Sequence, residues 1–170
     1  MNFVPDDNTA NDEIIVPFLE DARADFAPFY SSNKTVKQAS SELEKEMAKL
    51  GASVLRVQSG KFDVNGKNRL GYLIEFTLYG LRGELTVAAL PMRKPTPAKE
   101  NQARVQALLN VVQWIQTMVT KRVFSPGANP LIPYLLAADG RQILETLATS
   151  GMFQLAAPKQ DIVDAVIEEK

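Results

Sequence analysis

The side chains that could do chemistry in this chain of 170 residues are carboxylates and bases, because it contains neither cysteine nor histidine. Disulfides, thiolate metal sites and cysteine nucleophiles are therefore excluded, and so are Ser-His catalysis and histidine-ligated zinc or iron sites. No glycine-rich segment has the spacing of a phosphate-binding or dinucleotide-binding loop. The sequence therefore predicts no cofactor. A carboxylate metal site and a lysine–glutamate acid–base pair remain open.

Basic residues dominate the centre of the chain. Residues 1–50 carry a net charge of −5, residues 51–122 a net charge of +7 and residues 123–170 a net charge of −3. The central bases form two groups, one around a predicted hairpin and one around the start of a predicted helix. They are Lys61, Lys67, Arg69, Arg93, Lys94, Lys99 and Arg104. Such groups suit a phosphate backbone, and a helix N-terminus adds free amides and partial positive charge. The alternative is that they serve solubility and balance the acidic flanks.

Two glutamates form the carboxylate pair that a predicted sheet brings together. With a tight turn at Gly80-Leu81, Glu75 and Glu84 lie on neighbouring strands, offset by about one position. Two adjacent carboxylates can share a proton or hold a divalent cation. The alternative is that both are exposed sheet residues, balanced by Arg56 or Arg82.

Three predicted strands position these groups. Extended structure is favoured in three segments: residues 52–59 with a continuation through 61–64, residues 69–79, and residues 82–90. Asn65-Gly66 is typical of a type I′ hairpin turn, which needs positive φ at both central residues. The second strand alternates strictly, with apolar residues on one face. These are Leu70, Tyr72, Ile74, Phe76 and Leu78. The pattern predicts an antiparallel meander with one buried face and one mixed face.

Two helices flank the predicted strands. Thr35 and Gln38 have the spacing of a capping box, which indicates a helix over residues 35–50 that ends before Gly51. Thr96-Pro97 favours the start of a longer helix over residues 96–123. This second helix is apolar on more than one side, so we expect it to be contacted from two directions. The fold class is therefore α+β, with both helices on one face of the meander and a helical C-terminal extension.

The ends of the chain differ in composition from its centre. Residues 1–13 are acidic and polar and are predicted to be disordered. Residues 14–150 form a single α+β domain whose arm, residues 14–30, packs on its own core or docks on a second subunit. Residues 151–170 form a tail, in which residues 161–170 favour a short helix. We find no secretory signal and no membrane span, so we expect no membrane partner and a cytoplasmic location.

The helix–strand–strand–strand–helix order over residues 35–122 resembles that of the double-stranded-RNA-binding domain. Ala98-Lys99, Ala103 and Ala107-Leu108 are similar to the lysine-rich opening of that family's second helix. The chain departs from the family because it has no Gly-Pro-x-His loop and because Thr96-Pro97 replaces the lysine pair. The resemblance therefore implies the fold, and RNA binding only as an expectation.

Three functional hypotheses follow from these patterns. The first is a non-enzymatic nucleic-acid-binding module for DNA or RNA, in which the seven central bases contact phosphates and the open sheet face adds Arg56 and Tyr79. The alternative is a homo-oligomeric assembly or adaptor protein whose basic centre pairs with the acidic flanks. A minor alternative is an enzyme with a carboxylate metal site at Glu75 and Glu84. We expect the protein not to be an enzyme.

Overall fold

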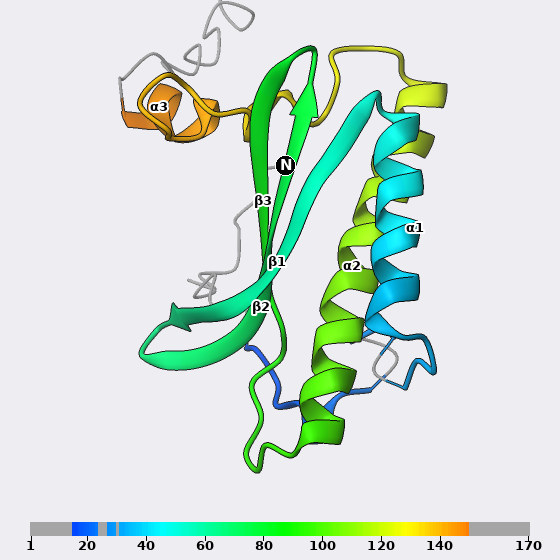
Figure 1. The fold of residues 1–170 in the computed structure, drawn as a ribbon, viewed down its shortest axis with the longest axis vertical. Coiled ribbons are helices and arrows are strands. Elements are labelled where there is room, and N and C mark those ends of the chain that lie inside the picture. The colour runs from blue at the N-terminus through cyan, green and yellow to red at the C-terminus, as the bar shows by residue number, and fades with distance from the viewer. Residues whose placement is uncertain (1–14, 24–26, 30, 150–170) are drawn as a thin grey trace, which may run out of the picture.

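A computed structural model describes residues 15–23, 27–29 and 31–149 of the chain (Figure 1). Its elements in order are η1 (Leu19–Asp21), α1 (Val36–Lys49), β1 (Ala52–Val64), β2 (Lys67–Leu78), β3 (Leu81–Ala88), α2 (Pro97–Phe124), η2 (Ile132–Tyr134) and α3 (Ile143–Thr149). Three antiparallel strands in the order β1-β2-β3 form the sheet. The predicted α+β class and antiparallel meander are confirmed. The predicted disordered segment and the C-terminal tail lie outside the described residues.

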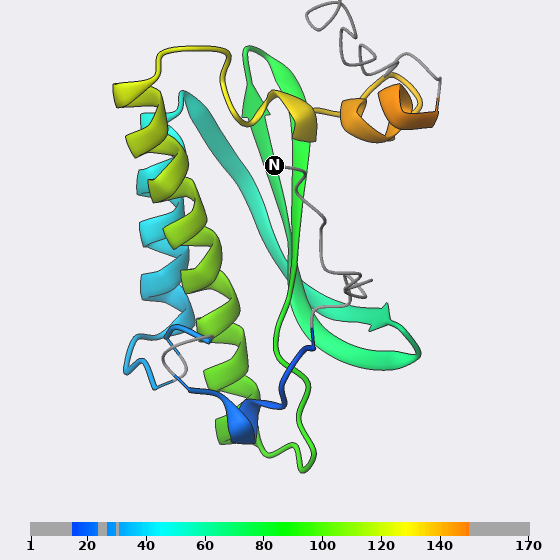
Figure 2. The same ribbon diagram turned by 180° about the vertical axis from the view of Figure 1, so that it is seen from behind.

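The hairpin between β1 and β2 forms where the sequence predicts it. Asn65 and Gly66 adopt φ values of 53° and 74°, as a type I′ turn requires. Nearer its start, β1 is irregular: the register shifts between Val54 and Arg56, so that Leu55 is the extra residue of a bulge. The distal half of the hairpin curls away from the two long helices (Figures 1 and 2). Its tip therefore projects from the open face of the sheet.

The turn between β2 and β3 lies one residue earlier than predicted. Tyr79 and Gly80 carry the positive φ values, 53° and 76°, and Leu78 pairs with Leu81. This register sets Gly83 opposite Phe76, whose ring fills the space where a Cβ would sit, only 2.3 Å from Cζ. The packing of one aromatic ring thus favours this register over the one that the local sequence indicated. Glu75 consequently faces Glu84 directly rather than with an offset.

Helices α1 and α2 lie side by side on one face of the sheet (Figure 1). The predicted capping box is present at the start of α1: the Thr35 hydroxyl accepts from the Gln38 amide N–H at 3.2 Å, and the Gln38 side chain accepts from the Thr35 amide at 2.8 Å. At the start of α2, the Thr96 hydroxyl accepts from the Lys99 backbone N–H at 3.3 Å, without a reciprocal bond. Gly51 follows α1 with φ 79°. Both helix starts are therefore as predicted.

The core lies between the two helices and the inner face of the sheet. The five alternating apolar residues of β2 are all buried, as predicted. Their neighbours from the helices include Leu43, Met47, Leu108 and Ile115. The segment after α2 closes one end of this core: Leu135 bridges to Gly83, and the Tyr134 ring stands edge-on to Trp114 with centroids 5.3 Å apart. None of the helices in the described part of the chain is long and apolar enough to cross a membrane.

Candidate nucleic-acid interface

The two predicted groups of bases meet at one end of the molecule. Lys61 and Arg69 from the hairpin line a groove of about 140 Å³, which is closed on its other side by Pro91, Met92 and Glu100. The groove thus joins the hairpin to the loop between β3 and α2, although the two segments are separated in the sequence by the rest of β2 and by β3. The fold therefore places the predicted hairpin bases and helix-start bases on one surface.

The N-terminal arm takes part in this surface through an aromatic ring. The Phe18 ring centroid lies 5.4 Å from Lys67 Nζ and 4.6 Å from Arg93 Cζ, so one ring faces a cation from each group. Leu19 beside it is buried, and its N–H donates to Pro91 O at 2.8 Å. In its described part, the arm packs on its own core, one of the two predicted alternatives. Its described residues include the 3-10 turn η1.

The Glu20 carboxylate from η1 lies against the loop that precedes α2. Glu20 accepts hydrogen bonds from the backbone N–H groups of Arg93 and Lys94, each at 3.3 Å, and from Lys99 Nζ at 3.1 Å. The pKa of Glu20 is lowered to about 2, first by a hydrogen bond from its own backbone N–H and then by the donors of Lys99, Arg93 and Lys94. We call these three donors, with the Arg93 guanidinium, the anion cradle.

The second acidic residue of the turn holds the guanidinium of the cradle. Arg93 donates to both carboxylate oxygens of Asp21, from Nη1 at 3.0 Å and from Nη2. This hydrogen bonding raises the pKa of Arg93 above its ordinary value. Two neighbouring carboxylates, Glu20 and Asp21, therefore neutralise the part of the basic surface that the sequence assigned to a phosphate.

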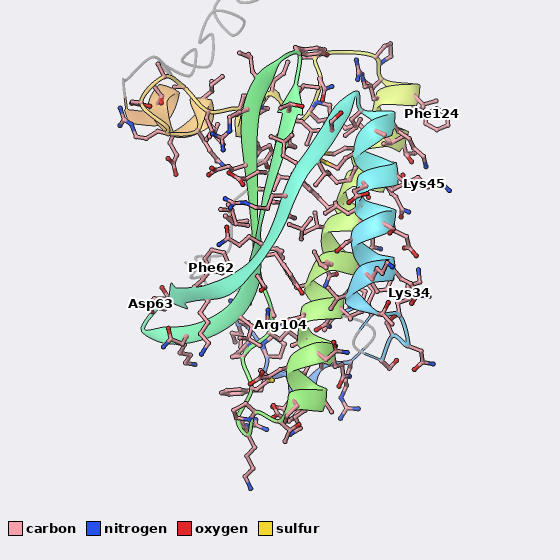
Figure 3. The ribbon with its side chains drawn as sticks, in the orientation of Figure 1. Lys34, Lys45, Phe62, Asp63, Arg104 and Phe124 are labelled. Atoms are coloured by element: carbon pink, nitrogen blue, oxygen red, sulfur yellow. The ribbon has the colours of Figure 1, made fainter. Side chains whose placement is uncertain are left out.

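Two of the predicted contact residues are engaged inside the fold. Arg69 is half-buried, and its guanidinium donates from Nε to Ala89 O at 2.7 Å and from Nη2 to Ala88 O at 3.2 Å. Burial lowers the pKa of Arg69. Arg104, on the first turns of α2 and facing the sheet in Figure 3, hydrogen-bonds Tyr72. These two residues tie strands and helix together at the basic end.

Three lysines remain directed to solvent at this end. Lys61, Lys67 and Lys94 are exposed. Among the described residues, the ammonium groups of Lys61 and Lys94 have no ion-pair partner, and Lys67 faces only the Phe18 ring. With the cradle bases Arg93 and Lys99, they are the part of the predicted set that is placed to meet an external anion.

Of the two sheet carboxylates, Glu75 is engaged by arginines. Both oxygens of Glu75 accept hydrogen bonds, one from Arg56 Nε at 2.5 Å and one from Arg82 Nη2 at 2.7 Å. The pKa of Glu75 is lowered, chiefly by the hydrogen bond from Arg56. The predicted balancing by Arg56 or Arg82 is thus confirmed, but Glu75 is buried rather than exposed. Within the described residues, no three acidic side chains gather closely enough to hold a metal ion.

Arg56 and Tyr79, which were predicted to add contacts from the open sheet face, do not lie on the basic surface. Arg56 is committed to Glu75. Tyr79 is exposed but sits in the β2–β3 turn, at the end of the sheet away from the Asn65-Gly66 hairpin (Figure 1). Trp114, in turn, is half-buried against Tyr134. Within the described residues, Phe18 is the aromatic ring that contacts two of the predicted bases, Lys67 and Arg93. The sequence had not indicated this contact.

The acidic turn is the main feature that the sequence reasoning did not locate. Its two carboxylates follow Phe18-Leu19, an apolar pair that anchors them, and charge complementarity with the basic centre was the available signal. No family model, curated protein or solved structure matches this chain. The likeness to the double-stranded-RNA-binding domain accordingly stays one of element order.

Proposed function

We propose that this protein is a non-enzymatic nucleic-acid-binding module that grips the phosphate backbone with its basic end. The observation that carries this proposal is the anion cradle. Two backbone N–H groups, an ammonium and a guanidinium converge there on the oxygens of Glu20 and Asp21. Phosphate oxygens accept the same donors, and charge-assisted hydrogen bonds of this kind are the strong ones.

The remaining lysines extend the basic surface from the cradle along the path of a bound nucleic-acid strand. Lys94 stands beside the cradle, and Lys61 and Lys67 lie on the hairpin across the groove. Successive phosphates of one nucleic-acid strand contact first the loop between β3 and α2 and then the β1–β2 hairpin. Because these contacts are to phosphates and not to base edges, the binding has little sequence preference.

The acidic turn competes with this binding in the same molecule. Glu20 and Asp21 occupy the donors that a phosphate would use, so a nucleic acid must displace them. The turn has only three residues, and its acidic side chains are solvent-accessible, so displacement leaves the core between helices and sheet intact. The competition lowers affinity most for short or weakly charged ligands.

A salt series tests the proposal. Labelled single- and double-stranded DNA and RNA are titrated with the full chain and with the variants Lys61→Glu and Lys67→Glu. Each reversal removes one phosphate contact, so the slope of log affinity against log salt should fall by about 1 for a duplex and slightly less for a single strand. The matched control is Lys45→Glu on α1, an exposed lysine that lies far from the hairpin residues Phe62 and Asp63 in Figure 3.

The outcomes separate the proposal from its alternatives. Loss of affinity in both hairpin variants, with the Lys45 variant unchanged, supports it. The absence of salt-dependent binding by the parent chain at low salt would refute it. The homo-oligomeric alternative loses one of its supports, because most apolar residues of α2 from Val105 to Ile115 are already buried within one chain against α1, the sheet and the segment around Leu135. Light scattering on the same samples measures the oligomeric state directly.

A further inference from the structure

The end of the molecule opposite the anion cradle carries a different surface. Val123 and Phe124, at the last turn of α2, are 72% and 84% exposed. A separate groove of about 330 Å³ lies between the end of α2 and the segment that follows it. Its lining is mainly apolar and includes Met118, Ala128, Pro130, Ile132 and Pro133. We call this groove the α2 end groove. Exposed apolar patches of this kind mark binding surfaces.

The α2 end groove is bordered by positive charge. Lys121 and Arg122 line it, and neither forms an ion pair with another described residue. The last carboxylate of α2 in the sequence is Glu100, six turns earlier on the same helix. A ligand that is apolar on one side and acidic on the other would satisfy both parts of this surface. A second copy of the same groove would bring bases against bases and is disfavoured.

We propose that residues 161–170 of the same chain dock in the α2 end groove. Their sequence, DIVDAVIEEK, has the required chemistry. At helical spacing, one side carries the aliphatic residues Ile162, Val163, Val166 and Ile167, and the other side carries Asp161, Asp164 and Glu168. The aliphatic side covers the apolar lining of the groove, and the carboxylates face Lys121 and Arg122.

The chain is long enough to make this contact. Helix α3 begins close to the groove, because Ile143 N–H donates to Leu135 O at 2.8 Å and Leu135 directly follows η2, whose Ile132 lines the groove. The seven residues of α3 span about 10 Å. Residues 150–160 reach up to about 36 Å when extended. The segment 161–170 can therefore return past the length of α3 to the groove.

With this segment docked, an acidic part of the chain lies against bases at both ends of the molecule. At the cradle, an acidic turn from the N-terminal side covers bases in the described structure. At the α2 end groove, an acidic segment from the C-terminal side covers the two bases that line it, Lys121 and Arg122. The docking is independent of nucleic-acid binding, since it involves none of the cradle or hairpin residues.

Cysteine pairs test the docking in the full chain, which has no native cysteine to interfere. One variant carries Ala128→Cys in the groove and Ala165→Cys in the segment. The matched control carries Ala98→Cys, also exposed, at the other end of α2 and about 40 Å away by helix length, with the same Ala165→Cys. Disulfide formation is followed in a glutathione redox buffer on non-reducing gels.

Docking predicts that the disulfide within one chain forms at least about tenfold faster for the Ala128 pair than for the Ala98 pair. Adding Lys121→Glu and Arg122→Glu should slow it, and adding Asp161→Lys and Asp164→Lys to that variant should restore it. Equal rates for the two pairs would overturn the proposal. A disulfide that links two chains would also overturn it, because the groove would then receive a second copy.

Discussion

Freeing the anion cradle is the perturbation that most directly probes this basic surface. The double variant Glu20→Gln and Asp21→Asn removes both carboxylates from the cradle while it keeps side chains of the same size. Arg93 and Lys99 are then available to phosphates. The pair of Arg93 with Asp21 has half-exposed partners, 52% and 48%, and such surface pairs add little to stability, so the variant should fold normally.

The size of the effect follows from counterion release. Each base that gains a phosphate steepens the slope of log affinity against log salt by about 0.9, which at 50 mM salt corresponds to about tenfold in affinity. Two freed bases therefore predict a dissociation constant about a hundredfold lower at 50 mM salt and a slope steeper by about 2. The gain should shrink as the salt concentration rises.

Fluorescence anisotropy with a labelled oligonucleotide measures both quantities. The control is Glu42→Gln with Glu44→Gln on α1, which changes the net charge by the same amount away from the cradle. If the control variant gains as much affinity as the cradle variant, the effect is one of net charge and the competition model is wrong. Unchanged affinity and slope in the cradle variant would refute the assignment of Arg93 and Lys99 to phosphates.

Three further predictions concern the fold and its carboxylates. Because the pKa of Glu20 is lowered from 4.5 to about 2, its contacts should persist at pH 4 and be lost only as the pH falls through about 2; a side-chain carboxyl NMR titration with a midpoint near 4.5 would contradict this. Gly83→Ala forces a Cβ against the Phe76 ring and should cost about 1–3 kcal/mol in urea unfolding, whereas Gly60→Ala, which has open space, should be nearly neutral. Because two guanidinium groups bind both oxygens of Glu75, added Mg²⁺ should leave Tm unchanged, and a raised Tm would revive the metal hypothesis.

Local patterns in the sequence predicted the elements well because their physical causes are local. The capping box of Thr35 and Gln38 joins residues three apart, and the Asn65-Gly66 turn depends on two adjacent φ angles. Alternation along β2 chose the buried face, because side chains of a strand point to opposite sides in turn. The sequence by itself thus determined the class, the order of the elements and the gathering of bases in the centre.

The tertiary structure decided what those bases do. Arg69 donates to the carbonyl oxygens of Ala88 and Ala89 because the end of β3 runs within its reach, and the β2–β3 register follows from one ring lying over Gly83. Glu20 reaches its cradle partners across 73 to 79 residues of sequence. No local pattern encodes such a distance, because which acid meets which base depends on where the whole core places the arm and the loop. The sequence therefore determined that opposite charges are available, and only the fold decided which of them pair.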